Sequence, residues 1–246
     1  MLFVRVLVLF LCTLCTHAYS EQPTTVYLYT YFDKPPFILD KRKQIGLSYD
    51  LASALTLYSN NYAFKIVYTP KQRALDSLDG GGGLLWVNPL WVDDAQQVRY
   101  LWSDSGVDDS EFYITNDKRL TYEGQSTFSG KIFIGVRGYK YFNLDPLISD
   151  GSIERFDLKN ERLLLEMLAK ERGDFAVMGF QVYYYLMQRH PELDGKIHIL
   201  TGYKRPFQRY ITFSKSHKKA MDEVNTFLKT PRWEELKAKW LVPIPE

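Results

Sequence analysis

Cysteine is scarce in this chain of 246 residues, and its two cysteines, Cys12 and Cys15, fall within the first twenty positions. We expect those positions to be removed on export. The remaining sequence then has no thiol for a disulfide, for thiolate chemistry or for a structural metal site. Stability must come from a hydrophobic core, and a chain of this length can bury roughly 70% of its unfolded surface.

An excess of positive charge is also missing. The chain has 31 basic and 29 acidic residues, whereas a nucleic-acid-binding domain presents a basic face. Histidine is rare, and His190, His198 and His217 lack the spacing of a metal site such as HExxH. We therefore expect no nucleic-acid partner, no metal and no cofactor.

Sequence motifs of catalytic sites are absent too. There is no GxSxG nucleophile elbow, and the adjacent acids Asp93-Asp94 and Asp108-Asp109 are interpreted as solvated turns because their side chains diverge. The run Gly80 to Gly83 lacks the Lys-Ser/Thr that completes a phosphate loop, so it predicts a turn. We expect no catalytic residues; an orphan hydrolase or lyase is the least favoured alternative.

The apolar run near the N-terminus is short. It covers Val6 to Leu14, follows Arg5 and precedes small residues around Ala18 and Ser20. It has about nine residues, and a membrane-spanning helix needs roughly 20, so residues 1–20 are interpreted as a cleavable signal peptide. Cleavage after Ala18 and after Ser20 both fit. We expect the mature protein to be periplasmic.

Strands and helices alternate along the rest of the chain. In its first part, periodicity and breaker residues predict strands at 26–32, 64–68 and 84–87 and helices at 48–58 and 72–78. In its second part, they predict strands at 131–136, 153–156, 174–178, 196–200 and 207–213 and helices at 161–170, 181–188, 218–228 and 233–240. Such alternation favours a parallel sheet covered by helices.

Several short motifs follow one another in a defined order. They are Pro35-Pro36-Phe37, Gly46 to Leu51, Arg73-Ala74-Leu75, Tyr100 to Ser103, Gly130-Lys131 with Gly135-Val136, Gly173 to Ala176, and the closing segment Trp233 to Trp240. With these motifs the chain resembles the bacterial extracellular solute-binding proteins of family 3, typified by the polar amino-acid receptors of ABC importers. Each motif alone is weak, and their order over nearly the whole mature chain carries the resemblance.

The resemblance implies the α/β, two-lobe fold of type II periplasmic binding proteins, in which each lobe is a mostly parallel sheet flanked by helices. Two crossover strands, expected near 111–116 and 208–213, would join lobe one (21–113 plus 212–246) to lobe two (114–211). The resemblance further implies a small-molecule ligand clamped by hinge closure, an ABC permease as partner, and a monomer. A membrane sensor that reads the ligand-bound form is the alternative partner.

Aromatic residues make up 15% of the sequence, and many of them stand in the loops that would line the cleft. Ligands of open α/β sheets lie beyond the carboxyl ends of the strands, near helix N-termini. The loops at those ends can form aromatic walls for a planar or cationic ligand. The candidates are Tyr31, Phe37, Trp86, Trp91, Tyr139 and Phe180; packing in the core is the alternative for several of them.

Two arginines are the polar candidates. Arg137 follows the strand at 131–136, and a guanidinium there can hold a carboxylate or a phosphate by paired hydrogen bonds. Exposure to solvent is its alternative. Arg73 stands near the start of a helix and points into the cleft or pairs at the surface with Asp76 or Asp79.

The chain departs from the amino-acid receptors at both ligand anchors. Their Thr-x-x-Arg element holds the ligand carboxylate, and the corresponding stretch here, 93–98, has Gln96 and Gln97 where the arginine would fall. Their lobe-two Asp holds the ligand ammonium, and the corresponding strand here runs into Gly179 and Phe180. Because an unpaired buried charge is costly, the joint loss predicts a ligand other than a standard α-amino acid. A pair of lobes that no longer binds any ligand tightly is the alternative.

Overall fold

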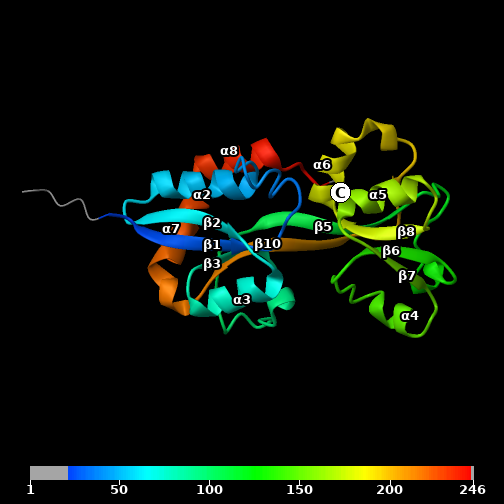
Figure 1. The fold of residues 1–246 in the computed structure, drawn as a ribbon, viewed down its shortest axis with the longest axis horizontal. Helices are drawn as coiled ribbons and strands as arrows, with labels where there is room; N and C mark the ends of the chain where they lie inside the picture. Colours follow the sequence, from blue (N-terminus) through cyan, green and yellow to red (C-terminus); the bar gives the residue numbers. More distant parts are fainter. Residues whose placement is uncertain (1–21, 245–246) are drawn as a thin grey trace, which may run out of the picture.

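The computed structural model describes residues 22–244, so the predicted signal peptide lies outside the described residues. Two lobes lie side by side along the long axis of the molecule (Figure 1). Within the described range, no helix combines the length and the apolar character needed to cross a membrane.

The first lobe is a sheet covered by helices on both faces. Its strands are β1 (Thr24–Thr30), β2 (Tyr62–Tyr68), β3 (Gly83–Val87), β4 (Leu101–Trp102) and β10 (Arg205–Phe213). Strands β2, β1 and β3 are parallel, and β10 runs antiparallel to β3 and β4. One face carries α2 (Leu47–Tyr58), α7 (Lys218–Phe227) and α8 (Pro231–Trp240), and the other carries α3 (Lys71–Gly80).

The second lobe repeats this plan. Its strands are β5 (Val107–Thr115), β6 (Ile132–Val136), β7 (Glu154–Leu158), β8 (Phe175–Gly179) and β9 (His198–Ile199), with β8, β6 and β7 parallel. One face carries α5 (Glu161–Ala169) and α6 (Phe180–Arg189), and the other carries α4 (Asp145–Ser149). Short 3-10 turns are η1 (Pro89–Val92), η2 (Gln125–Phe128), η3 (Pro191–Leu193) and η4 (Lys215–His217).

Alternation of side chains along the strands explains why each sheet has two cores. Val26 and Leu28 of β1 are buried in the cluster beneath α2, α7 and α8, whereas Tyr29 packs on the α3 side. In lobe two, Ile134 faces α5 and α6, whereas Phe133 joins an aromatic cluster on the α4 side. This is the period of two that a doubly covered strand requires.

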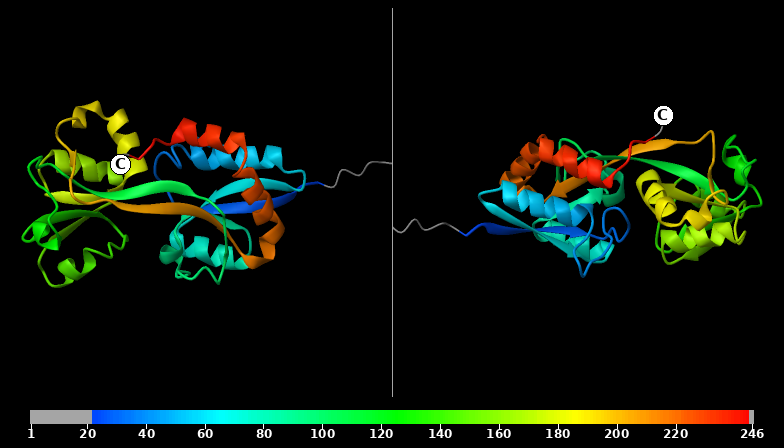
Figure 2. Two further views of the ribbon diagram at one scale, coloured as in Figure 1. Left: turned by 180° about the vertical axis from the view of Figure 1, so that it is seen from behind. Right: turned by 90° about the horizontal axis from the view of Figure 1, so that it is seen from above.

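Strands β5 and β10 connect the lobes (Figure 2). They pair with each other, antiparallel, between residues 107–111 and 205–209. Beyond that stretch, residues 111–115 of β5 pair with β8, and residues 210–213 of β10 pair with β3 and β4. This pairing shares residue 111 and residues 208–209 with the crossovers predicted at 111–116 and 208–213. We propose that the lobes meet within 107–111 and 205–209.

The C-terminal segment makes a third link. After α8 it leaves lobe one and reaches α6 of lobe two (Figure 2). The side-chain amide of Gln181 donates to the carbonyl of Val242 at 2.9 Å, and its oxygen accepts from the Val242 N–H at 3.1 Å.

The interpretation of the two acidic pairs as solvated turns is wrong for Asp94 and Asp109, whereas Asp93 and Asp108 are exposed. Asp109 lies in β5 with 1% of its surface exposed, and Asp94 is 3% exposed. The Asp94 carboxylate accepts hydrogen bonds from the N–H groups of Val98 and Arg99, both at 2.9 Å, and so holds together the loop that follows η1. Local polarity could not reveal these partners, because they come from tertiary contacts or from loop geometry.

Candidate ligand cleft

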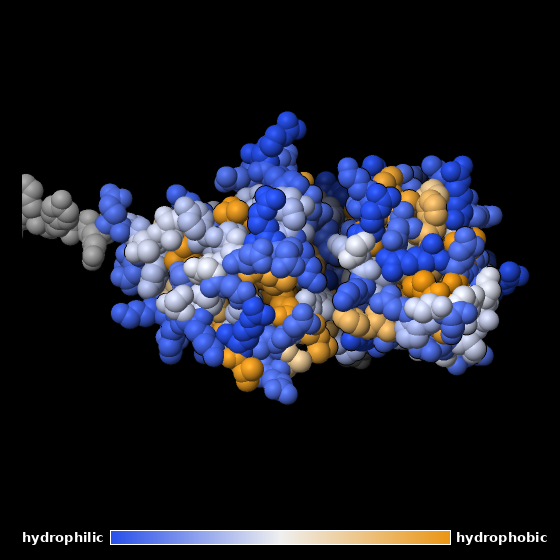
Figure 3. All heavy atoms as spheres, turned by 60° about the horizontal axis from the view of Figure 1, so that its bottom comes forward, coloured by the Kyte–Doolittle hydropathy of each residue, from blue (hydrophilic) through white to orange (hydrophobic). Residues whose placement is uncertain are grey.

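A cleft of about 780 Å³ lies between the two lobes. Its walls are the loops after β1, β3 and β6 and the start of α5, and its floor includes β5 and β10. Figure 3 shows the furrow between the lobes, with apolar residues on both sides. The cleft thus occupies the carboxyl ends of the parallel strands in both sheets, where ligands of this sheet type bind.

Aromatic side chains from both lobes line this cleft. Four of the predicted residues are in the lining, namely Tyr31, Trp91, Arg137 and Tyr139. The other aromatic lining residues are Phe32, Tyr68, Tyr113, Tyr141, Phe142 and Phe207. Phe32 stacks on Trp91 with ring centroids 6.2 Å apart, and Phe207 meets Trp91 edge to face at 5.5 Å.

The structure places the other four predicted residues outside the lining. Phe37 and Trp86 lie in the core of lobe one with ring centroids 5.2 Å apart, and the Trp86 Nε1–H donates to Ser48 Oγ at 2.8 Å. Phe180 is buried at the start of α6 and packs on Phe112 at 5.6 Å. Each of these rings finds its contacts within one lobe.

Arg73 lies exposed on α3 and is not part of the lining. The two acids that were its expected partners at the surface, Asp76 and Asp79, interact with other residues. Asp76 accepts from Gln72 at 3.0 Å, and Asp79 pairs with Arg99 at 2.7 Å. Lys71, at the start of the same helix, is part of the lining, whereas Arg73 is not, a difference that the helical period alone could not decide.

A buried ion pair joins the two crossover strands at the floor. Arg209 Nη2 lies 2.8 Å from Asp109 Oδ2, and the two side chains are 3% and 0% exposed. The Arg209 Nε–H donates to the same oxygen at 2.9 Å. The other oxygen, Oδ1, accepts from the N–H groups of Ser110 and Gln181, so Asp109 also anchors the first turn of α6. A side chain at Gly179 would collide with this pair, since a Cβ there would lie 2.9 Å from Oδ2.

The guanidinium of Arg209 is surrounded by rings. Its central carbon lies 4.6 Å from the ring centre of Phe32, 5.2 Å from that of Trp91 and 4.8 Å from that of Phe207. Such faces stabilise a desolvated cation. Its remaining nitrogen, Nη1, is buried and has no hydrogen-bond partner among residues 22–244.

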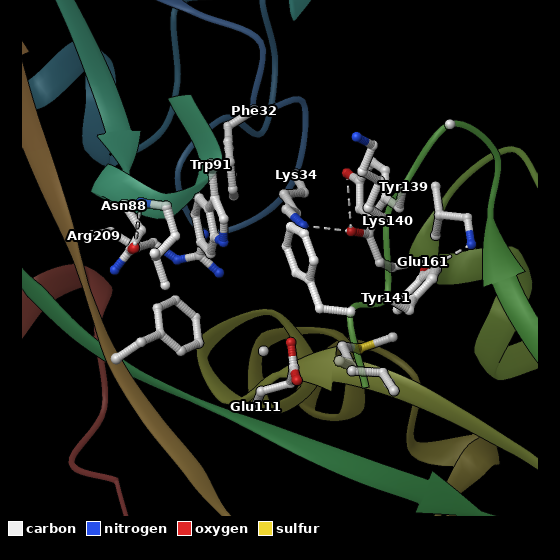
Figure 4. A pocket seen from close by; sticks show the side chains of 18 of the residues that line it. Phe32, Lys34, Asn88, Trp91, Glu111, Tyr139, Lys140, Tyr141, Glu161 and Arg209 are labelled. Atoms are coloured by element: carbon white, nitrogen blue, oxygen red, sulfur yellow. Dashed lines mark hydrogen bonds and ion pairs between the residues drawn. The ribbon is translucent and has the colours of Figure 1, made fainter. Parts of the chain in front are cut away.

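A second ion pair crosses the cleft from one lobe to the other (Figure 4). Lys34 Nζ, in the loop after β1, lies 2.6 Å from Glu161 Oε1 at the start of α5, and the side chains are 11% and 9% exposed. Burial acts to raise the pKa of Glu161, but the Lys34 ammonium, the Glu161 backbone N–H and Arg209 together hold that pKa below its usual value. Burial likewise acts to lower the pKa of Lys34, and the Glu161 carboxylate raises it above the usual value. Both groups are therefore charged at neutral pH.

Glu111 is the remaining acid of the floor. Burial raises the pKa of its carboxyl above the usual value. Its ion-pair partner is Arg205, whose Nη1 lies 3.9 Å from Glu111 Oε1. The Tyr203 hydroxyl lies 3.5 Å from the same oxygen. These contacts are long for hydrogen bonds, so Glu111 is weakly held compared with Glu161.

The lining as a whole is basic. Six of its residues are lysine or arginine and three are aspartate or glutamate. Arg137 and Lys140 stand exposed on the lobe-two rim and Lys71 on the lobe-one rim. No three His, Cys, Asp or Glu side chains within residues 22–244 gather in a way that could hold a metal ion.

Sequence reasoning missed four charged residues of the cleft, namely Lys34, Glu111, Glu161 and Arg209, and it missed Asp109, which is buried behind Arg209. A local signal existed for two of them. Lys34 stands in a loop already assigned to the cleft, and Glu161 follows Asn160, a preferred N-cap residue whose side chain accepts from the Leu163 N–H at 3.1 Å. The others become recognisable once the pairing of β5 with β10 is known.

No family model and no curated protein matches this chain. Solved structures do match it. A structure from work on glutathione import via GshT and the cystine ABC importer TcyBC of Streptococcus mutans is 16% identical, with a TM-score of 0.69, and the match covers 91% of this chain and 98% of that one. An ancestral arginine-binding protein bound to arginine is 15% identical, with a TM-score of 0.67 and coverage of 88% and 97%.

A third match is an ancestral amino acid-binding protein described as a precursor of cyclohexadienyl dehydratase. It is 16% identical, with a TM-score of 0.65 and coverage of 89% and 96%. At such identities the likeness is one of fold. The chain has the two-lobe α/β fold of type II periplasmic binding proteins, and the fold predicted from the sequence is confirmed.

Proposed function

We propose that this protein is a periplasmic solute-binding protein, which captures a small molecule between its lobes and delivers it to an ABC importer. The observation that carries the proposal is the cleft of about 780 Å³, whose lining comes from both lobes and from the strands between them. A solute bound there would touch both lobes at once, so binding would favour the closed arrangement. Small-molecule sites have volumes of roughly 300–1,000 Å³.

The proposed ligand is not a standard α-amino acid held by two charged anchors. A ligand ammonium needs a free carboxylate, and Glu161 is already paired with Lys34. The other two acids of the lining are Asp93, which is exposed, and Glu111, whose pKa is raised by burial. The importer is proposed by likeness to the structure from work on glutathione import via GshT and the ABC importer TcyBC.

A thermal-shift screen of a broad metabolite library tests this function. A ligand that binds the native state raises the melting temperature with its concentration, and the same ligand should change the fluorescence of Trp91, which lines the cleft. In Trp91→Phe the fluorescence response should disappear, whereas in Trp240→Phe it should persist because Trp240 lies outside this cleft. A protein that responds to no solute would contradict the proposal. Adjacent permease and ATPase genes would favour import over signalling.

A further inference from the structure

The ion pair between Lys34 and Glu161 lies in the middle of the cleft, and a cavity of about 780 Å³ remains around it. Its 2.6 Å contact joins a loop of lobe one to the first turn of α5 in lobe two (Figure 4). Both residues line the cavity. The chain therefore supplies an ammonium group of its own to the carboxylate that faces the ligand space.

Each charge of this pair is satisfied by its surroundings. The Lys34 ammonium lies 4.6 Å from the ring centre of Phe32 and 5.0 Å from that of Tyr139, in addition to its contact with Glu161. The Tyr139 hydroxyl donates to the same carboxylate oxygen at 3.5 Å. A ligand ammonium could reach Glu161 only by displacing Lys34, and a buried lysine without its partner is costly.

The charge that remains in the lining favours an anion. With Lys34 paired to Glu161 and Arg209 paired to the buried Asp109, the lining keeps four other basic residues (Lys71, Arg137, Lys140 and Arg205) against Asp93 and Glu111. Asp93 is exposed on the rim, and Glu111 faces Arg205.

Arg209 gives an independent indication at the floor of the cleft. Its side chain is 3% exposed, and its Nη1 has no hydrogen-bond partner in the described part of the chain. A buried donor without an acceptor costs free energy, and an oxygen of a ligand seated against Phe32, Trp91 and Phe207 would supply that acceptor.

We propose that the cleft takes a small solute that carries a carboxylate or another anionic group and lacks an amino group, with Lys34 as the residue that sets this preference. Lys34 fills the cation position beside Glu161, so an amine on the ligand has no partner there. The inference rests on the proposed function, because it concerns the ligand of the same cleft.

Matched pairs of probes test the preference directly. The probes are 3-phenylpropionate with phenylalanine and glutarate with glutamate; each pair differs by one α-amino group. Calorimetric titration of the wild-type protein should show about tenfold tighter binding of the amine-free member, which corresponds to about 1.4 kcal/mol. In Lys34→Met the ratio should move by about tenfold or more toward the amino member, because Glu161 is then free to accept its ammonium.

Lys41→Met is the matched control. Lys41 also forms a 2.6 Å ion pair, with Asp33, but the two side chains are 41% and 46% exposed and neither lines the cleft. Its removal should leave the preference unchanged. Glu161→Gln is the second variant: it leaves the Lys34 ammonium without a counter-charge, so binding of the dianion glutarate should strengthen relative to that of 3-phenylpropionate. If Lys34→Met does not fold, the relative binding of glutarate and 3-phenylpropionate by Glu161→Gln tests the proposal instead.

The outcomes separate the two proposals. Binding of phenylalanine or glutamate by the wild type as tightly as their amine-free partners would overturn the inference and leave a solute-binding function standing. An unchanged ratio in folded Lys34→Met, or an unchanged glutarate preference in Glu161→Gln, would also overturn it. A wild-type protein that binds none of the four probes overturns the inference, and one that also binds nothing in the wider library overturns the proposed function.

Discussion

Buried ions are the residues on which this cleft depends most strongly. Asp109 has no exposed side-chain surface, yet it accepts hydrogen bonds from Arg209, Ser110 and Gln181. A buried pair of this kind contributes little compared with apolar residues of the same volume, but removing one partner leaves an uncompensated charge. Local sequence could not identify it, because the two residues are 100 positions apart.

Arg209→Met should therefore destabilise the protein by about 3–5 kcal/mol, since Asp109 would stay buried without its cation. The free energy of unfolding in urea measures this loss. Arg119→Met is the control, because Arg119 pairs with Asp117 while its side chain is 85% exposed, and solvent-exposed pairs contribute little to stability. Equal losses in the two variants would show that the buried pair has no special role.

Among the secondary-structure elements, α5 is the one that positions a charged residue of the cleft. Asn160 caps its N-terminus, and Glu161 in the first turn lies where the helix dipole favours an acidic side chain. The helix itself was predictable, because its apolar residues recur at helical spacing and bury Leu164, Leu165 and Leu168. The partner of Glu161 was not, since Lys34 comes from the other lobe.

Asn160→Ala should lower the free energy of unfolding by about 1 kcal/mol, because the Leu163 N–H loses its acceptor. Urea denaturation measures it. Asn61→Ala serves as the control, since Asn61 is exposed and its side chain bonds only to the flexible end of Glu223, at 2.8 Å; its loss should stay within about 0.5 kcal/mol. A loss in Asn160→Ala no larger than in Asn61→Ala would mean that the cap does not hold α5.

Strand β5, unlike α5, could not be predicted along its whole length from the local sequence. Its second half was expected to be a crossover strand, whereas residues 107–110 include two adjacent acids that predicted a turn. They form a strand because β10 pairs with them and because Arg209 neutralises Asp109. Pairing and charge compensation overrode local propensity there.

For the molecule as a whole, three links join the lobes: the crossover strands, the C-terminal segment bonded to α6, and the Lys34 to Glu161 pair across the cleft. The first two lie away from the mouth of the cleft and are compatible with a hinge. The third bridges the cleft itself and would have to break when the lobes open. The closed arrangement should therefore depend on the protonation of this pair.

Acid should open the lobes. The folded-state pKa of Glu161 is lowered, so the pair stabilises the closed form above the usual carboxyl pKa of about 4.3 and is lost as the pH falls through the lowered value. Arg209 also lowers that pKa. The radius of gyration from small-angle X-ray scattering should stay constant between roughly pH 5 and 8 and rise below about pH 4.

Circular dichroism must show that the secondary structure persists at the acidic end. Glu161→Gln is the comparison, since it lacks the titrating group and should already be more open at neutral pH. A radius of gyration that rises equally in the variant and the wild type would assign the opening to other carboxyl groups.

The sequence by itself determined most of the strands and helices, the absence of cysteine after Cys15 and the aromatic character of the cleft loops, because periodicity, composition and turn residues are local properties. It also placed Tyr31, Trp91, Arg137 and Tyr139 in loops that reach the cleft. The tertiary structure alone decided which charges meet, since Lys34 and Glu161 are 127 positions apart and lie in different lobes. The role of a charged residue depends on its partner and on its burial in the fold, and neither can be predicted from the neighbouring residues in the sequence.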